Sequence, residues 1–166
     1  MLRLALPIAI GLASASASFA QVDIRFTEGT PTDTFTLTNT GCALSAVTVV
    51  IDGTGSYGGM IFDTKDGGAV SDAAQPFQIL NGQISAVAVE DAGPLLRFQV
   101  LDWPSESVVS FTIDVDDVLR HGDQGRTQVS GGEIAGAEVR ISSDTASGFG
   151  VFDNTRRATV RRLCGS

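Results

Sequence analysis

The stretch Val108-Val109-Ser110-Phe111-Thr112-Ile113-Asp114-Val115 alternates between apolar and polar side chains, the pattern of a β-strand with one buried face. It predicts that Phe111, Ile113 and Val115 face inward and that Thr112 and Asp114 face outward. Similar short runs recur along the chain, separated by Gly, Asp, Asn and Pro, at 22–26, 34–38, 43–51, 57–62, 95–101, 133–141 and 158–163. Roughly nine or ten short strands without helical crossovers predict an all-β chain folded as an antiparallel β-sandwich, jelly-roll or immunoglobulin-like.

Two local signals refine this prediction. The runs 77–80 and 83–89 flank Asn81-Gly82, and both turn residues tolerate the positive φ of a type I′ turn, so the sequence predicts a β-hairpin here. Helical periodicity is absent, apart from a turn at 116–119.

The first twenty residues have the composition of a secretory signal peptide. Arg3 precedes an apolar run that ends in small residues, with Ser18 and Ala20 at the positions that a signal peptidase requires. The apolar run is far shorter than the roughly 20 residues of a membrane span, which argues against a membrane anchor. We therefore predict a signal peptide at 1–20 and one β-sandwich domain at 21–166, secreted or periplasmic, with no membrane span in the mature chain.

The chain has two cysteines, Cys42 and Cys164. In the oxidising environment of an exported protein such a pair normally closes, so we predict a Cys42–Cys164 disulfide. A catalytic thiol would need a base beside it, and the single histidine, His121, lies in a predicted loop. The sequence therefore disfavours a thiol enzyme.

The formal net charge of −8 is unevenly distributed. Acidic residues outnumber basic ones about threefold between Gln21 and Thr155, which makes nucleic acid an unsuitable partner. Cations, polar sugars and basic protein surfaces fit better. Four arginines crowd the C-terminal segment: Arg156, Arg157, Arg161 and Arg162. They form either a solvated last strand, which we favour, or a docking patch for an acidic partner.

The candidate metal ligands are Asp114, Asp116 and Asp117. Asp114 and Asp116 project from the same face of the predicted strand, and Asp117 follows where the strand ends. Carboxylates this close repel one another unless a cation intervenes. Ca²⁺ takes six to eight oxygen ligands, so the shell would be completed by backbone carbonyls and by one of three further carboxylates: Asp52, Asp63 or Asp66. The alternative is a solvated acidic strand end.

No catalytic motif is assembled in the sequence. Asp114 and Asp116 could serve as the paired carboxylates of a glycosidase, but only Trp103 and Tyr57 are available to stack on sugars, and Trp103 is expected in the core. A Gly-x-Ser-x-Gly elbow is missing, as is a phosphate-binding loop. We therefore predict that the chain is not an enzyme. A carbohydrate-active enzyme and a plain carbohydrate-binding module remain the alternatives.

Several strand and turn motifs together resemble a known family. They are Ile24-Arg25-Phe26-Thr27-Glu28-Gly29, Asn39-Thr40-Gly41-Cys42-Ala43-Leu44, Ile61-Phe62-Asp63-Thr64, Phe111-Thr112-Ile113-Asp114-Val115-Asp116-Asp117 and Ser130-Gly131-Gly132-Glu133-Ile134-Ala135-Gly136-Ala137. The chain thereby resembles the core protein of the sponge aggregation factor and its small secreted bacterial homologues. That resemblance implies extracellular assembly and calcium-dependent adhesion. The expected function is therefore a secreted structural or adhesive module that associates with itself, another extracellular protein or a glycan, with Ca²⁺ as the candidate cofactor.

Overall fold

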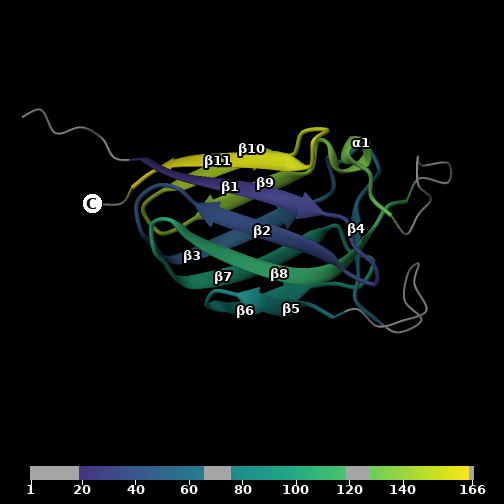
Figure 1. Ribbon diagram of the computed structural model, residues 1–166, viewed down its shortest axis with the longest axis horizontal. Helices are drawn as coiled ribbons and strands as arrows, with labels where there is room; N and C mark the ends of the chain where they lie inside the picture. The colour runs from purple at the N-terminus through teal and green to yellow at the C-terminus, as the bar shows by residue number, and fades with distance from the viewer. Residues whose placement is uncertain (1–18, 66–75, 119–127, 165–166) are drawn as a thin grey trace, which may run out of the picture.

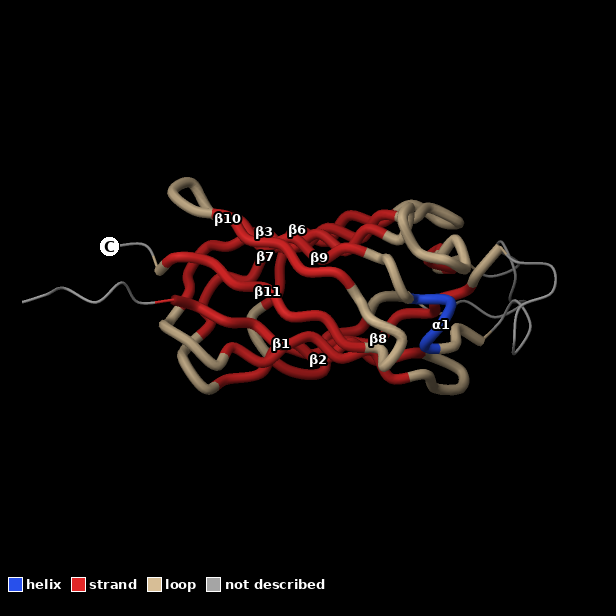
Figure 2. Tube along the Cα trace, turned by 90° about the horizontal axis from the view of Figure 1, so that it is seen from above, coloured by secondary structure: helices blue, strands red, loops and turns tan. Residues whose placement is uncertain are grey.

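The computed structural model describes residues 19–65, 76–118 and 128–164 and contains two antiparallel sheets packed face to face (Figure 1). Figure 2 shows the two layers of strands and the short helix α1 (Gly131–Ile134) at one end of them. The predicted all-β sandwich is therefore confirmed.

One sheet has six strands, in the order β11-β1-β2-β8-β4, and β5 also pairs with β8. Its members are β1 (Phe19–Thr27), β2 (Asp33–Asn39), β4 (Ile61–Asp63), β5 (Gln78–Asn81), β8 (Ser107–Asp116) and β11 (Arg157–Leu163). The first and last strands of the chain, β1 and β11, pair in antiparallel fashion from Phe19 opposite Leu163 to Arg25 opposite Arg157.

The other sheet has five strands, in the order β10-β9-β3-β7-β6. Its members are β3 (Leu44–Asp52), β6 (Ile84–Val89), β7 (Leu95–Trp103), β9 (Glu138–Ser142) and β10 (Ser147–Val151). The two sheets meet along one side, where the backbone of Gly150 in β10 lies against that of Thr159 in β11, so closely that a Cβ at position 150 would overlap the Thr159 carbonyl oxygen.

The core fills the space between the sheets with the inward-facing residues of both. Phe111, Ile113 and Val115 are fully buried, as the period-two pattern predicts. The Phe111 ring stacks on Phe35 of the neighbouring strand at 5.3 Å and meets Phe98 of the opposite sheet edge-on at 5.1 Å. These aromatic contacts therefore couple the two sheets at the centre of the core.

The predicted Cys42–Cys164 disulfide is present, with a Cα–Cα distance of 6.3 Å. It joins the residue after β11 in one sheet to the segment that leads into β3 in the other. Buried Asn39 supports this junction, because its Nδ2 donates to the carbonyl oxygens of Cys42 at 2.8 Å and of Trp103 at 3.1 Å. Both cysteine sulfurs are in this bond, so neither is a free thiol, which removes the catalytic-thiol alternative.

The predicted hairpin around Asn81-Gly82 is wrong in its pairing. Strands β5 and β6 flank the turn as expected, and Gly82 has a φ of 93°. However, β5 pairs with β8 in one sheet and β6 pairs with β7 in the other. The turn therefore carries the chain from one sheet across to the other, because the left-handed conformation of Gly82 is a local property and does not decide which strands β5 and β6 pair with.

Three further predictions need correction. Residues 57–60 form a turn, so only Ile61–Asp63 of the predicted 57–62 run is a strand. The predicted strand 133–141 begins at Glu138, because Gly131–Ile134 forms α1. The predicted turn at 116–119 is not helical at 116–118, where Asp116 is the last residue of β8. Strand β10 was not predicted.

The predicted signal peptide falls almost entirely outside the described residues. Strand β1 begins at Phe19, so cleavage after Ala20 would remove its first two residues. The division into residues 1–20 and 21–166 stays a prediction. The predicted loop around His121 also lies outside the described residues.

Candidate metal centre

Asp114 and Asp116 lie on the face of β8 opposite to its core residues, yet they are 8% and 1% exposed. Strand β4 lies beside this end of β8, with Asp63 directly opposite Asp114 and Ile61 opposite Asp116. Since opposed residues in an antiparallel pair point to the same face, Asp63 joins the two carboxylates of β8. Asp63 is itself 1% exposed.

The three carboxylates are close enough to share one ion. Asp63, Asp114 and Asp116 each offer an oxygen, and these oxygens all lie within 4.8 Å of one another. Two oxygens that each lie about 2.4 Å from a Ca²⁺ ion are separated by at most about 4.8 Å. We call this group, Asp63, Asp114 and Asp116, the acidic centre. Its donor set fits a hard divalent cation that takes oxygen ligands.

The environment of Asp114 in the acidic centre disfavours its negative charge. Burial, and secondarily the neighbouring Asp63 carboxylate, raise the pKa of Asp114 to about 6, although a hydrogen bond with the Val115 backbone acts in the opposite direction. A cation bound among these oxygens would reverse both effects, because it replaces the lost hydration and screens the repulsion.

Asp33 adds another buried carboxyl at the same end of the sandwich. Its Oδ2 accepts the Val115 N–H at 2.9 Å and its Oδ1 accepts the Gly29 N–H at 3.0 Å. Both bonds favour the ionised form. Burial is nevertheless the larger effect, and together with the charges of Glu28 and Asp114 it raises the pKa of Asp33 to about 8. Repulsion among acidic groups thus extends beyond the acidic centre itself.

Two more buried carboxylates flank the turn that precedes β4. Asp117 is fully buried, and Glu133 of α1 is 2% exposed. Gly58 lies between them, because a Cβ at that position would be 3.1 Å from the Asp117 Cβ and 2.9 Å from the Glu133 Cβ. Asp117 was a predicted ligand, whereas sequence reasoning missed Glu133.

A capping box positions Glu133. Its Oε2 accepts the Ser130 N–H at 2.7 Å, while the Ser130 Oγ accepts the Glu133 N–H at 3.3 Å. The Ser-x-x-Glu spacing at 130–133 is a known signature of a helix start. That signal in the sequence could have located both the helix and its buried carboxylate.

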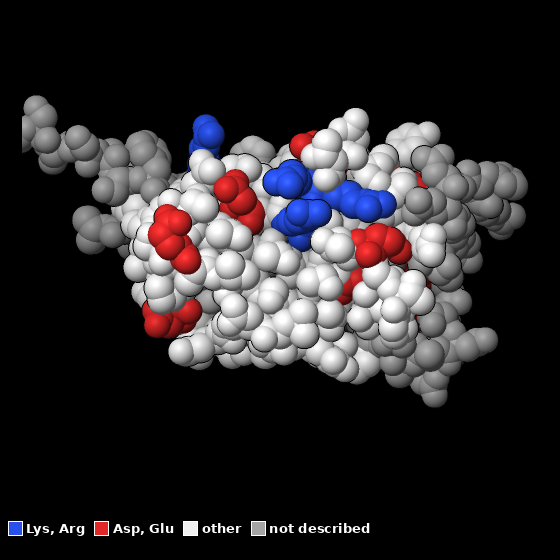
Figure 3. Space-filling view, in the orientation of Figure 1, with Lys and Arg blue, Asp and Glu red and all other residues white. Residues whose placement is uncertain are grey.

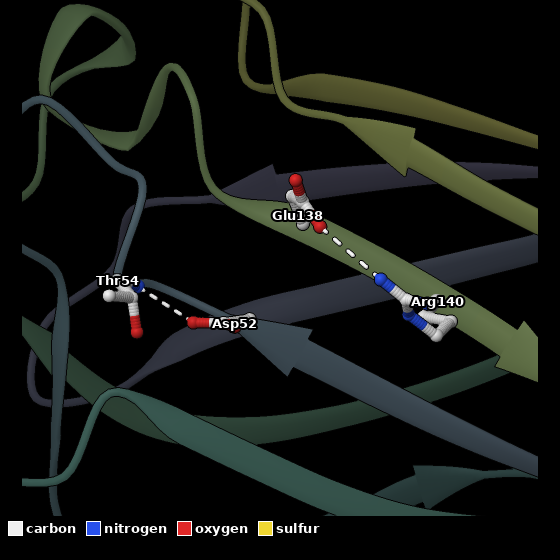
Figure 4. A network of polar contacts seen from close by, with 4 residues as sticks. All are labelled: Asp52, Thr54, Glu138 and Arg140. Carbon is white, nitrogen blue, oxygen red and sulfur yellow. Dashed lines mark hydrogen bonds and ion pairs between the residues drawn. The ribbon is translucent and has the colours of Figure 1, made fainter.

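Asp52, which the sequence offered as an additional ligand, lies away from the acidic centre. Asp52 ends β3 in the opposite sheet, and its Oδ1 accepts the Thr54 N–H at 2.8 Å within the following turn, close to the Glu138–Arg140 ion pair of 3.7 Å (Figure 4). Asp66 lies outside the described residues. Of the three carboxylates considered as additional ligands, the structure therefore brings Asp63 to Asp114 and Asp116.

The aromatic residues do not form a platform for sugar rings. Trp103 is fully buried, and its Nε1 donates to the Ser107 carbonyl oxygen at 3.3 Å, so it is a core residue. Tyr57 is 77% exposed. A sugar-stacking pair of Trp103 and Tyr57 is consequently not available, which weakens the alternative of a carbohydrate-binding module that uses these rings.

The arginines of the C-terminal segment lie on β11, the end strand of the six-stranded sheet, and in the turn before it. Arg157 and Arg161 are exposed on β11, whereas Arg156 is half-buried in the turn before it. The backbone of Arg162 pairs with that of Ala20.

Comparisons with protein-family models, with curated proteins and with solved structures each find no match for this chain. Among the helices of the described residues, none is long and apolar enough to cross a membrane.

Proposed function

We propose that this chain is an exported, non-enzymatic structural or adhesive module, stabilised by Ca²⁺ at the acidic centre, that associates with itself or with an extracellular glycan. The observation that carries the proposal is the convergence of Asp63, Asp114 and Asp116, whose oxygens lie within 4.8 Å of one another in a buried setting. Buried carboxylates at this spacing are unfavourable unless a cation or protons neutralise them.

The choice of Ca²⁺ among divalent ions follows from the ligand chemistry. Ca²⁺ accepts six to eight oxygens in flexible geometry, whereas Mg²⁺ requires a near-ideal octahedron and keeps several waters. A buried centre with three carboxylates supplies part of a Ca²⁺ shell, whereas its burial is unfavourable for Mg²⁺, which keeps several of its waters. Transition metals would be better served by His or Cys ligands, and the acidic centre contains neither.

The extracellular role is supported by other features of the chain. The Cys42–Cys164 disulfide is typical of proteins in oxidising compartments. The N-terminal residues have the pattern of a signal peptide, and the strand motifs resemble aggregation factor core proteins. In this proposal the carboxylates bind an ion and do not act as a general acid and base.

The experiment is thermal unfolding of the mature, oxidised protein in EGTA, in Ca²⁺ and in Mg²⁺, with light scattering to follow its size. A ligand that binds only the native state stabilises it by about 2.7 kcal/mol at a hundred times its dissociation constant. For a domain of this size that corresponds to a rise of roughly 5–10 °C in Tm. A rise with Ca²⁺ that exceeds the rise with Mg²⁺ is expected.

Equal unfolding curves in EGTA and Ca²⁺ would refute the calcium part of the proposal. A calcium-dependent rise in Tm without a change in size would instead retain the metal site and direct the search for a partner to glycans.

A further inference from the structure

The outward side chains of the six-stranded sheet are polar over residues 21–27 of β1, 34–38 of β2 and 157–161 of β11. Outward residues alternate with buried core residues along β11, β1 and β2. The strand register places Arg157, Arg25 and Thr36 in one row across these strands, and Thr159, Asp23 and Thr38 in the next row. Figure 3, which views this face, shows basic side chains gathered over β1 and β11.

Arg25 and Arg157 are an unusual pair because they carry like charges directly opposite each other. Opposed like charges destabilise a sheet unless a counter-charge compensates them. Within the described residues, the ion pair that forms is Arg140–Glu138 on the other sheet, and the Arg25 side chain has no hydrogen-bond partner. Asp153 interacts electrostatically with Arg157, but its Oδ1 already accepts the N–H groups of Thr155 and Arg157.

A shallow depression of about 210 Å³ lies between these side chains, with Arg25, Arg157, Thr36, Thr38, Thr159 and Asp23 in its lining. Asp23 is held at one end of it, because its Oδ1 accepts the Thr159 Oγ1–H at 2.8 Å and the Gln21 Nε2–H at 3.2 Å. The other end presents two guanidinium groups and the hydroxyl of Thr36. The depression therefore offers guanidinium donors to an anionic group and hydroxyls to an adjoining polar, uncharged group of the same ligand.

We propose that this depression binds an anionic glycan, with a sulfate ester or carboxylate of one sugar between Arg25 and Arg157 and the adjoining sugar hydroxyls on Thr36 and Thr38. The proposal rests on the glycan-binding part of the proposed function and names the class of glycan. Planar guanidinium groups match sulfate and carboxylate oxygens in bidentate geometry.

The composition of the face favours a glycan over an acidic protein. Protein interfaces have a core of aromatic and aliphatic residues that exclude water. Over residues 21–27, 34–38 and 157–161 the outward side chains are Arg, Thr, Asp and Gln, and this described stretch of the face has no aromatic or aliphatic anchor. A hydrated polymer of sugars does not need such an anchor, since hydroxyl and charged groups supply its contacts.

Strand pairing with a partner is disfavoured at the opposite side of the sandwich. The edge strand β6 is interrupted by a register shift between Ser85 and Ala88, and Ala86 in the middle of it has a φ of 49°. Bulges of this kind protect an edge from pairing with another chain. A flat face is therefore a better binding surface than this edge.

The test measures binding of size-defined heparin fragments, a sulfated probe, with hyaluronate as a carboxylated probe, neutral dextran as a negative control and poly-glutamate as an acidic polypeptide. The variant is Arg25→Gln/Arg157→Gln. Its matched control is Arg97→Gln/Arg140→Gln, which makes the same charge change on the exposed face of the other sheet. We expect heparin or hyaluronate to bind wild type and the control alike, and the variant at least tenfold more weakly.

Equal weakening in the two double variants would overturn the proposal, because the interaction would then depend only on total charge. Binding of poly-glutamate as tight as that of both glycans would overturn it in favour of an acidic protein partner, and absence of binding to any probe would also overturn it. Each measurement is made in EGTA and in Ca²⁺, and Tm is recorded alongside. Glycan binding without a rise in Tm in Ca²⁺ would support the glycan site and refute the calcium site. A rise in Tm in Ca²⁺ without glycan binding would support the calcium site and refute the glycan site.

Discussion

Asp63 of β4 lies directly opposite Asp114 of β8, and both carboxylates are almost completely withdrawn from water. An antiparallel pair of strands usually places complementary or apolar side chains at such positions. Here the sheet register holds two acidic groups together, with Asp116 as the third. Carboxylates this close repel one another, and a bound cation offsets that repulsion, so we expect these residues to affect stability in opposite directions with and without a cation.

Neutralising one member of the acidic centre should therefore have opposite effects with and without calcium. We expect Asp114→Asn to raise the stability of the protein in EGTA by about 1 kcal/mol, since like-charge repulsion is relieved, and to abolish the stabilisation by Ca²⁺. Urea unfolding in EGTA and in Ca²⁺ measures both. Asp52→Asn, in the turn after β3, is the control and should retain the full calcium response. An unchanged calcium response in Asp114→Asn would remove this residue from the metal site.

Asp33 should make the cation-free protein less stable as the pH rises. Its pKa lies at 3.8 in the unfolded reference and at about 8 in the folded protein, so the folded state holds its proton more tightly. The resulting stabilisation is complete below the lower value and is lost progressively as the pH approaches the upper one. Urea unfolding in EGTA at several values between about pH 5 and pH 8 should show this decline, and Asp33→Asn should reduce its slope, leaving the smaller contribution of Asp114. Asp144→Asn, at an exposed position, should leave the slope unchanged.

Reduction of the disulfide should destabilise the fold strongly. Cys42 and Cys164 are 122 residues apart, and the chain-entropy model gives a loop of this length roughly 5 kcal/mol as an upper value. Denaturant unfolding with and without reductant should show a large fall in the unfolding midpoint. The Cys42→Ser/Cys164→Ser protein is the control, because its lower stability should no longer respond to reductant. An unfolding midpoint of the wild-type protein that stays the same after complete reduction would contradict this expectation.

The two glycines of α1 should respond differently to alanine. A Cβ at Gly131 would overlap the backbone carbonyl oxygen of Asn154, whereas a Cβ at Gly132 would meet only the Ser130 Oγ at 3.8 Å. We expect Gly131→Ala to cost about 1–3 kcal/mol, as other overpacking substitutions do, and Gly132→Ala to be neutral or slightly stabilising. Chemical denaturation of the two variants is a direct comparison, and equal destabilisation would argue against close packing of α1 on the turn before β11.

Local patterns were sufficient for most strands. Alternation in the 108–115 run predicted the inward side of Phe111, Ile113 and Val115, because side-chain direction in a strand follows from position alone. The disulfide could be predicted because two cysteines in an exported protein normally pair in the oxidising environment outside the cytoplasm. The strand pairing could not be predicted in the same way. Asn81-Gly82 has the composition of a hairpin turn, yet β5 pairs with β8 and β6 pairs with β7, because the composition of a turn is a local property that does not fix the partners of the flanking strands.

In the candidate site, too, some relationships between residues could be predicted from the sequence and others could not. The sequence by itself determined that Asp114 and Asp116 share one side of a strand, that the chain forms a β-sandwich, and that two cysteines could close it. Only the tertiary structure decided that Asp63 joins them, that Glu133 is buried near Asp117, and that Arg25 faces Arg157. These are relationships between strands and helices distant in sequence. Their physical cause is sheet register, which is set when whole apolar faces are buried together and cannot be read from any one segment.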